Sequence, residues 1–450
     1  MNEKVEDDKD VPNLCRVIPL EDYEIPQGPR EVKEKIGGLF RNLFKSTKEE
    51  NFLSYNKLNS FSLRQLDNIL PEPDWEEMVQ YFQKELNKID YKKLLLINKP
   101  FSGTDQIVEK WVETANYKLL TPPTYEEILN YHKRKDNVFE LGEEENIAIT
   151  NLEKWFLRHH NGLGLLENIV QNLSKHSNEV IIVCQSWAWK FFKILNIPFT
   201  NFEQRILQTM NESALKHWLL NLMAQNNRKK FLYRLTDSGD LIFEEQLSLV
   251  EMGEEKGDKI KTKIEKENNM EQLIVQDEDD ELKLKTKEGV EEEIQLKVED
   301  KFMRNLIAYA QGLPMICWHI LRDNLRTRPD EDFEFDKEEE VKLERKRFYT
   351  IWVKPWKGIT MPEIPKNMNS EENILLDSLI LHNGLSKEKL ALILNIESKK
   401  VVSIINYLET HGLIRRKEED VLNIVPSAYP NVRDYLRSVG FLIDNLEVSK

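Results

Sequence analysis

Short apolar runs alternate with amphipathic stretches between residues 91 and 184, and this alternation constrains the fold more than any other feature of the sequence. The runs expected to form strands are 93–97 (KLLLI), 117–120, 147–150 and 180–184 (VIIVC). The stretches between them carry apolar residues at helical spacing, as over 107–112 and 166–173. Successive strands separated by helices are joined by crossovers, so the sequence predicts a largely parallel sheet.

The first expected strand leads through a turn into an expected helix. The turn reads Asn98-Lys99-Pro100-Phe101-Ser102-Gly103-Thr104-Asp105. This order resembles the phosphate loop of P-loop NTPases of the AAA+ or STAND type, whose pattern is G-x-x-x-x-G-K-[ST]. Only Gly103 matches that pattern, because Thr104 stands at the lysine position and Asp105 at the position of the magnesium-binding hydroxyl. The resemblance in fold covers about residues 75–245 and 300–328.

These departures fall on the residues that a phosphate loop needs for its chemistry. Such a loop surrounds a polyanion with backbone N–H groups and one cation. Asp105 would add a carboxylate beside the phosphates, and in a dehydrated site that contact costs several times the roughly 1 kcal/mol that it costs in water. Lys99 leaves from the wrong end of the loop. The resemblance implies ATP with magnesium as cofactor, whereas the departures favour a pseudo-ATPase or a domain without any cofactor.

Other residues join the candidate nucleotide site only through the resemblance. The full set is Lys99, Ser102, Gly103, Thr104, Asp105, Glu153, Gln185 and Arg322. Glu153 is the acid nearest the third strand, where a hydrolytic enzyme has Asp-Glu. Gln185 follows VIIVC at the place of a polar sensor, and Arg322 ends a segment similar to the lid helix, where an arginine can contact the γ-phosphate. We assign no catalytic residue and expect no metal site, since the adjacent His159 and His160 point to different sides of a helix.

The C-terminal segment predicts three short helices followed by a two-stranded hairpin. The helices are expected to begin at Ser370, Ser386 and Ser398, the hairpin strands to cover 413–416 and 421–425, and a last helix to cover 432–441. This order resembles a winged-helix domain over about 369–425. In such a domain the third helix is the recognition helix and the hairpin is the wing.

The winged-helix resemblance implies a surface for DNA or for a partner protein. Its candidate contact residues are Lys399, Lys400, Ser403 and Asn406 on the third helix and Arg415, Arg416 and Lys417 on the wing. Residues 371–450 hold 10 bases and 12 acids, a net charge of −2. Domains that bind DNA usually carry a clear positive excess, so docking of a protein is favoured and DNA contact is the alternative.

Charge is negative overall and concentrated in one window. The chain has 79 acids and 64 bases, a net charge of −15, which argues against a protein that coats nucleic acid. Residues 251–300 hold 18 acids and 9 bases and no aromatic residue. Within them, apolar and polar residues alternate over 282–284 and 294–298. We interpret this window as a solvated acidic insertion that carries a small hairpin.

Several features bear on location. No run approaches 18 apolar residues, so no membrane-spanning helix is expected, and the acidic N-terminal segment is unlike a secretory signal. Cys15, Cys184 and Cys317 are scattered, which fits a reducing compartment, and we predict a cytoplasmic protein. The basic amphipathic stretch 31–47 could attach to a membrane surface, although packing onto the body of the protein is favoured.

The sequence therefore predicts a P-loop NTPase-like α/β core with a helical lid and a C-terminal α+β winged-helix domain. The expected division is an irregular extension (1–70), core and start of the lid (71–245), acidic insertion (246–300), lid helix (301–328), connector (329–368) and winged helix (369–446). The expected function is that of a non-hydrolytic regulatory or scaffold protein whose winged helix docks a protein partner. The alternatives are a DNA-binding regulator and an ATP-binding ATPase, and a homo-oligomer is compatible with each.

Overall fold

The computed structural model describes most of the regions that carry the sequence motifs. The described residues are 14–23, 55–131, 145–224, 230–243, 273–276, 282–285, 291–293, 300–329, 348–417 and 420–444. The amphipathic stretch 31–47 and most of the acidic window lie outside them, so the predictions made for those segments stay predictions. Among the described residues, no helix is both long and apolar enough to cross a membrane.

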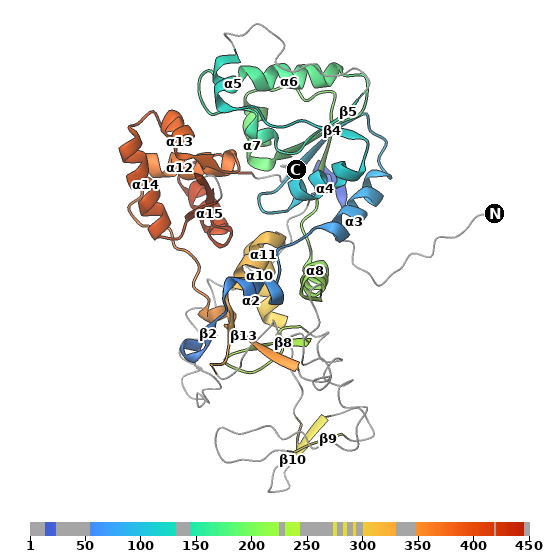
Figure 1. The fold of residues 1–450 in the computed structure, drawn as a ribbon, viewed down its shortest axis with the longest axis vertical. Coiled ribbons are helices and arrows are strands. Elements are labelled where there is room, and N and C mark those ends of the chain that lie inside the picture. Colours follow the sequence, from blue (N-terminus) through green and yellow to red (C-terminus); the bar gives the residue numbers. More distant parts are fainter. Residues whose placement is uncertain are drawn as a thin grey trace, which may run out of the picture.

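A six-stranded sheet forms the largest part of the structure (Figure 1). Its strands are β1 (Val17–Pro19), β3 (Lys93–Asn98), β4 (Tyr117–Leu119), β5 (Asn146–Ile149), β6 (Val180–Gln185) and β7 (Glu203–Leu207). They lie in the order β1-β7-β3-β6-β5-β4. All neighbouring strands run parallel except β1, which pairs antiparallel with β7 at one edge. The prediction of a largely parallel sheet is confirmed.

The two central strands are apolar because both of their faces are covered. Leu94 to Ile97 of β3 and Val180 to Cys184 of β6 are buried along their whole length. Helices cover the sheet, as crossover connections require. They are α3 (Glu76–Leu86), α4 (Thr104–Thr114), α5 (Tyr125–Asn130), α6 (Gly164–Lys175) and α7 (Ser186–Ile194). Burial raises the pKa of the Cys184 thiol, which agrees with an unreactive core residue.

The order of the strands fixes where a ligand could bind. The connection after β3 runs through α4 to β4 at one edge, whereas the connection after β6 runs through α7 to β7 on the other side of β3. The two right-handed crossovers therefore lie on opposite faces of the sheet. Open α/β sheets bind ligands at such a point, outside the carboxyl ends of the two strands. Here that point is the end of β3 at Asn98 and the end of β6 at Gln185.

A second, four-stranded sheet uses residues that the sequence assigned to different segments. Its strands are β2 (Asn59–Ser60), β12 (Leu325–Thr327), β13 (Phe348–Val353) and β8 (Lys230–Leu235). The strand-like run of the expected connector is β13, which pairs parallel with β8 and antiparallel with β12. The helices α8 (Glu212–Ala224), α10 (Asp300–Ala310) and α11 (Pro314–Asp323) lie between the two sheets (Figure 1).

Two segments differ from their expected structure. The segment expected to be irregular (1–70) contains the edge strand β1, the strand β2 and the helix α2 (Leu63–Ile69), which are too short to give a clear periodic signal. In the acidic window, β10 (Leu282–Lys285) pairs antiparallel with β11 (Glu291–Glu293) and with β9 (Leu273–Gln276). The expected second hairpin strand, 294–298, lies outside the described residues.

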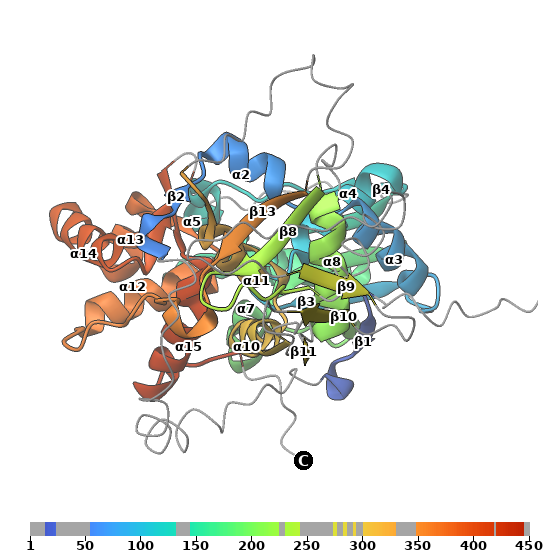
Figure 2. The ribbon, with the colours of Figure 1, turned by 90° about the horizontal axis from the view of Figure 1, so that it is seen from below.

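The C-terminal residues form a separate α+β unit beside the core (Figure 2). Its helices are α12 (Ser370–Leu381), α13 (Lys387–Leu394), α14 (Ser398–Thr410) and α15 (Tyr429–Ser438), and its three-stranded sheet has the order β14 (Leu385–Ser386), β16 (Val421–Ile424), β15 (Ile414–Arg416). Asn369 begins α12 with a capping box, and the Ser386 side chain caps α13 as the sequence indicates. The hairpin strands β15 and β16 pair antiparallel.

The last helix ties this unit to the core through buried polar contacts. The indole N–H of Trp187 on α7 donates to the Tyr429 hydroxyl of α15 at 3.1 Å. The hydroxyl of Tyr309 on α10 donates to the Ser427 carbonyl at 2.7 Å. The ring of Phe101, in the turn after β3, packs edge-on against Tyr429 with centroids 5.2 Å apart. Helix α15 thus contacts the candidate phosphate-loop turn directly.

Replacing Tyr429 by Phe is expected to lower the free energy of unfolding by about 1–3 kcal/mol, because the buried Trp187 N–H would lose its acceptor. Chemical denaturation of the full chain measures this. Tyr407→Phe is the matched control, because this half-buried tyrosine of α14 contacts His411 through its ring, which phenylalanine keeps. An equal effect of the two substitutions would contradict the proposed anchoring of α15.

Candidate functional site

The turn after β3 has the shape of a loop that leads into a helix, but its polar side chains bind one another. Gly103, with φ 78°, precedes the first residue of α4. The hydroxyls of Ser102 and Thr104 are buried and lie 2.9 Å apart. Thr104 therefore stands at the position where the phosphate-loop pattern has its lysine, and its hydroxyl forms a hydrogen bond with Ser102 within the turn.

Gly103 leaves room for the side chain of Trp75, a role that does not involve a phosphate. The ring of Trp75 lies over it, and a Cβ atom at residue 103 would be 2.2 Å from Cη2 of Trp75. Trp75 itself stacks on Trp218 of α8 with centroids 5.7 Å apart. The glycine thus allows the close approach of an aromatic side chain, and its positive φ suits glycine as well.

Lys99 is buried and binds a carboxylate of the chain itself. Its side chain is 7% exposed, and its ammonium nitrogen lies 2.9 Å from the Asp444 Oδ2 atom and 2.8 Å from the Asp444 carbonyl oxygen. The same nitrogen lies 5.5 Å from the ring centroid of Tyr23. The cation that could swing towards a phosphate is therefore held by residue 444, which is 345 positions away in the sequence.

The end of β6 contributes to the same contact. Ser186, the first residue of α7, donates its hydroxyl to Asp444 Oδ2 at 2.8 Å. One carboxylate oxygen thus accepts hydrogen bonds from Lys99, which follows β3, and from Ser186, which follows β6. The buried guanidinium of Arg433 on α15 adds positive potential near this contact. Burial acts to lower the pKa of this group, but Tyr429, Asp434 and, to a smaller extent, Asp444 raise it above its ordinary value.

A second carboxylate, that of Asp105, lies in the first turn of α4. Burial raises the pKa of this carboxyl, and the charge of Glu109 raises it further. Backbone N–H groups at a helix start are the usual donors to a bound phosphate. In this structure an acid, Asp105, stands in the first turn of the helix at which such a phosphate would bind.

Glu153 lies behind the loop in the short 3₁₀ helix η4 (Leu152–Lys154) and is 1% exposed. Its Oε2 accepts from the backbone N–H of Gln185 at 3.1 Å, and Asn383 lies 3.5 Å from its Oε1. Burial raises the pKa of this carboxyl to about 7. The backbone of Gln185 therefore contacts Glu153, as two neighbouring parallel strands that end at the same edge allow.

The C-terminal unit contacts the core at Glu153. The ring of His382, which follows α12, is buried and accepts at Nε2 from the Arg158 N–H at 3.3 Å, while Nδ1 lies 3.2 Å from the Glu153 carbonyl oxygen. Arg158 also forms an ion pair with Asp377 of α12. Burial lowers the pKa of His382 to about 4 and raises the pKa of Asp377 to about 6. The neutral imidazole donates at Nδ1 and accepts at Nε2, so it bridges two core backbone groups.

Arg322 is not part of this constellation. Its guanidinium donates to the Leu70 carbonyl at 2.6 Å, pairs with Asp67, and lies 5.0 Å from the Trp318 ring. Both hydrogen-bonding partners lie at helix α2 (Leu63–Ile69) and its end. The structure therefore brings together the loop residues, Glu153 and Gln185, but it uses Arg322 to hold α2 against α11.

The expected DNA or partner contacts divide into two groups. Lys399, Ser403 and Asn406 are exposed on one side of α14 at positions i, i+4 and i+7. Three of the other candidates bind within the chain: Lys400 to Glu371 at 2.5 Å, Arg416 to Glu409 at 3.0 Å and Arg415 to His319 of α11 at 3.0 Å. Lys417 is exposed at the end of β15, and its backbone N–H donates to Val421.

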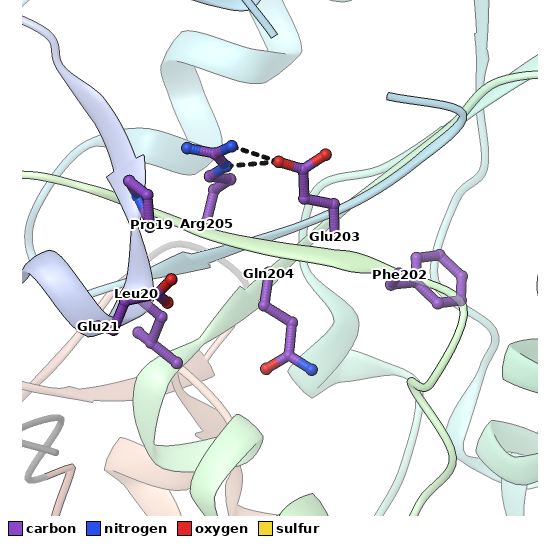
Figure 3. A pocket seen from close by; sticks show the side chains of 7 residues that line it. All are labelled: Pro19, Leu20, Glu21, Phe202, Glu203, Gln204 and Arg205. Carbon is purple, nitrogen blue, oxygen red and sulfur yellow. Dashed lines mark hydrogen bonds and ion pairs between the residues drawn. The ribbon is translucent and has the colours of Figure 1, made fainter. Parts of the chain in front are cut away.

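A hollow elsewhere on the surface does not coincide with the site. It lies at the edge of the sheet beside β1 and β7 (Figure 3). Its lining residues are Pro19, Leu20, Glu21, Phe202, Glu203, Gln204 and Arg205. In Figure 3 the Arg205 guanidinium pairs with the Glu203 carboxylate, and the Nε–Oε1 distance is 2.7 Å. Because β7 runs parallel to β3, its first residues lie towards the amino ends of the strands, away from the turn after β3.

Sequence reasoning missed the residues that complete the site. Asp444 is a single acid in a C-terminal segment, Asp377 and His382 belong to a different unit, and Trp75 precedes the core strands. No spacing links any of them to the loop. Among the described residues, no three His, Cys, Asp or Glu side chains come together in a way that could hold a metal ion.

Comparison with known proteins gives little further information. No family model matches the chain, and no curated protein matches it. One solved structure that is similar in part concerns DNA unwinding at forked double-stranded DNA by two coordinating Pif1 helicases. Its identity to this chain is 10% and its TM-score 0.18, over 48% of this chain and 75% of the other. The mixed α/β sheet is consistent with a P-loop-like core, but a likeness at this TM-score carries no argument about function.

Gly103→Ala is expected to destabilise the protein by about 2–4 kcal/mol, because the new methyl group would meet the Trp75 ring and also adopt an unfavourable φ. Gly440→Ala is the matched control, since Gly440 has φ 86° and no atom within 4 Å of its Cβ position. The control should cost about 1 kcal/mol from φ alone. Thermal and chemical denaturation measure both, and equal values would show that Trp75 does not lie against the loop.

Glu153→Gln is expected to become progressively more stabilising as the pH rises. The carboxyl has a pKa of about 7 in the folded protein against an ordinary value of 4.5, so the folded state holds its proton more tightly. This contribution to stability is complete below pH 4.5 and is lost as the pH rises through 7. The difference in unfolding free energy between variant and wild type should therefore grow by about 3 kcal/mol across this interval.

The difference between the unfolding free energies of the variant and the wild type at each pH excludes the titration of His382 and Asp377, because both proteins keep these residues. Glu363→Gln, at an exposed position of the connector, is the control and should show a difference that does not change with pH. A pH-independent difference for Glu153→Gln would contradict the burial of its carboxyl.

Proposed function

We propose that this chain is a non-hydrolytic regulatory or scaffold protein, with a P-loop-like core that has lost its nucleotide chemistry and a winged-helix unit that docks a protein partner. The observation that carries this proposal is the contact of Lys99 with Asp444. A phosphate loop needs a free cation beside its backbone donors. The one lysine of this turn binds a buried carboxylate, and the hydroxyl of Ser186 is bound to the same carboxylate.

The groups beside Lys99 support the same proposal. Asp105 stands in the first turn of α4, and a phosphate bound there would meet its carboxylate. Glu153 would have to be ionised and open to water or magnesium in order to support hydrolysis. Instead it is buried, has a raised pKa, and accepts from the backbone of Gln185.

The contacts of the C-terminal unit support docking. His382 and Asp377 hold α12 against the core next to Glu153. In a winged helix, the wing cations would face DNA phosphates. In this chain Arg415 binds His319 and Arg416 binds Glu409, so two of the three wing cations are engaged by the protein. The exposed face of α14 is then the surface we assign to a protein partner.

DNA binding is the second candidate, and one observation favours it. Lys399, Ser403 and Asn406 lie on the same exposed side of the helix that corresponds to a recognition helix. A side chain of each kind can contact phosphates or bases. The single lysine among them and the net charge of −2 over 371–450 predict at most weak, strongly salt-dependent binding.

The intact chain is expected to show neither saturable binding of ATP with magnesium at millimolar concentration nor hydrolysis above background. Isothermal titration and a phosphate-release assay measure the two. Lys99→Met is the control that separates a loop activity from contamination. Magnesium-dependent turnover in the wild type that disappears in Lys99→Met would overturn the proposal in favour of an active ATPase.

A mobility-shift experiment with random duplex at low salt decides between the two docking candidates. Our proposal predicts no shifted complex. DNA binding through α14 predicts a complex that Lys399→Glu weakens at least about tenfold, as loss of a contact of 1.4 kcal/mol does. Lys357→Glu, on the connector outside this unit, is the matched charge control.

A further inference from the structure

The strongest feature outside the proposed docking surface is the manner in which Asp444 is held. Lys99 binds two different groups of this one residue, the side-chain Oδ2 at 2.9 Å and the main-chain carbonyl at 2.8 Å. Ser186 binds the same Oδ2 at 2.8 Å. Donors that contact both the carboxylate and the backbone of a residue recognise an aspartate within a peptide, and not only a negative charge.

The position and electrostatics of this contact are those of a binding site. It lies beside the carboxyl ends of β3 and β6, where an open α/β sheet binds its ligands. Asp444 is 2% exposed and is surrounded by Lys99 and the buried Arg433. Asn98 and Gln185 are the last residues of the same two strands. Their side-chain amide oxygens are buried and have no hydrogen-bond partner among the described residues.

The segment that carries Asp444 is held by polar contacts at its end and by apolar packing before it. Helix α15 ends at Ser438, and the Phe441 N–H still donates to Leu436 at 2.9 Å. Within the described part of the chain, residues 442–444 make no backbone hydrogen bond to other backbone groups. Leu442 is 37% exposed, and Ile443 is partly buried against the core. Phe441 and Ile443 thus pack partly buried against the core, and the polar contacts of Asp444 hold the end of this strap, which we define as residues 441–444.

We propose that Lys99 and Ser186 form a receptor for an aspartate residue of a peptide, that Asp444 is its resident occupant, and that the strap is a releasable plug over the carboxyl ends of β3 and β6. An aspartate-bearing peptide segment of a partner protein competes with the strap for these two donors. The proposal goes beyond the loss of nucleotide chemistry proposed above, because it gives the degenerate site a ligand of a different chemical class.

The test begins with Asp444→Ala in the full chain. The substitution removes the Asp444 carboxylate from the buried Lys99 and opens a space the size of that group, so Tm should fall. Acetate fits that space and should raise the Tm of this variant by about 1.5 °C when its concentration is about ten times its dissociation constant. Acetate should leave the wild type unchanged, because its site is filled. It should also leave Asp444→Ala/Lys99→Met unchanged, because the cation is gone.

Two controls test whether the effect of acetate is specific to the missing Asp444 carboxylate. Asp434→Ala removes the exposed acid that pairs with Arg433, and acetate should not raise its Tm, because Lys99 keeps its partner. Phosphate at matched ionic strength should raise the Tm of Asp444→Ala no more than chloride does. Rescue by phosphate above that by acetate would show a phosphate site and overturn the carboxylate receptor. Absence of any acetate effect specific to Asp444→Ala would overturn it as well.

A labelled peptide with the sequence of residues 440–447 tests recognition of the backbone and side chain together. It should bind Asp444→Ala at least tenfold more tightly than the same peptide with asparagine at the aspartate position, and binding should be lost with Lys99→Met added. Equal affinity of the two peptides would contradict the proposal. None of these measurements involves nucleotide, so ATP turnover by the wild type would overturn the proposed function and leave this result to be judged by itself.

If Asp444→Ala does not fold, Asp444→Asn is used instead to test whether the strap controls access to Lys99. This variant keeps the shape of the side chain but weakens its hold on the ammonium group. Acylation of Lys99 by a small active ester, followed by mass spectrometry, should be at least tenfold faster in Asp444→Asn than in the wild type. An unchanged rate would show that the strap does not control access to Lys99.

Discussion

The buried contact between Lys99 and Asp444 is the interaction on which the rest of the site depends. An isolated ammonium group in this position would be strongly unfavourable, and a carboxylate with a second donor from Ser186 makes its burial possible. The contact joins the end of the first core strand to the last described residue of the chain. It therefore links the state of the loop to the position of α15, which also contacts the loop through Tyr429 and Phe101.

A second buried polar contact places the C-terminal unit against the same edge of the sheet. His382 bridges the backbone of Arg158 and Glu153, and it does so only as a neutral imidazole. Burial keeps it neutral by lowering its pKa to about 4. Glu153 in turn accepts from the backbone of Gln185 at the end of β6. Glu153 therefore contacts the core through Gln185 and the C-terminal unit through His382 and Asn383.

Much of the fold could be predicted because it is encoded locally. KLLLI and VIIVC are short apolar runs typical of strands buried on both faces, and their neighbours have helical spacing, which together predict a parallel sheet. Two of the three C-terminal helices likewise begin at capping side chains, Asn369 before α12 and Ser386 before α13. The four-stranded sheet was not predicted, because β8 and β13 are separated by more than 100 residues and pair parallel, and no local periodicity encodes that partnership.

The candidate site could be located but not completed from the sequence. The departures at Thr104 and Asp105 predict a loop without its chemistry, and the structure supplies the partners of each residue there. The occupant, Asp444, is one acid among 79 and has no motif around it. Arg322 shows the opposite case, since its position in the sequence suggested a contact with a phosphate whereas its guanidinium holds α2.

A double-mutant cycle of Lys99→Met and Asp444→Asn tests this account most directly. If the two side chains form the buried pair described here, each single change should lower the free energy of unfolding by about 3 kcal/mol, and the double change by little more than either alone. The coupling energy should then be about 2–3 kcal/mol. Additive effects, with a coupling energy below about 0.5 kcal/mol, would show that Lys99 does not bind Asp444 and would contradict the account.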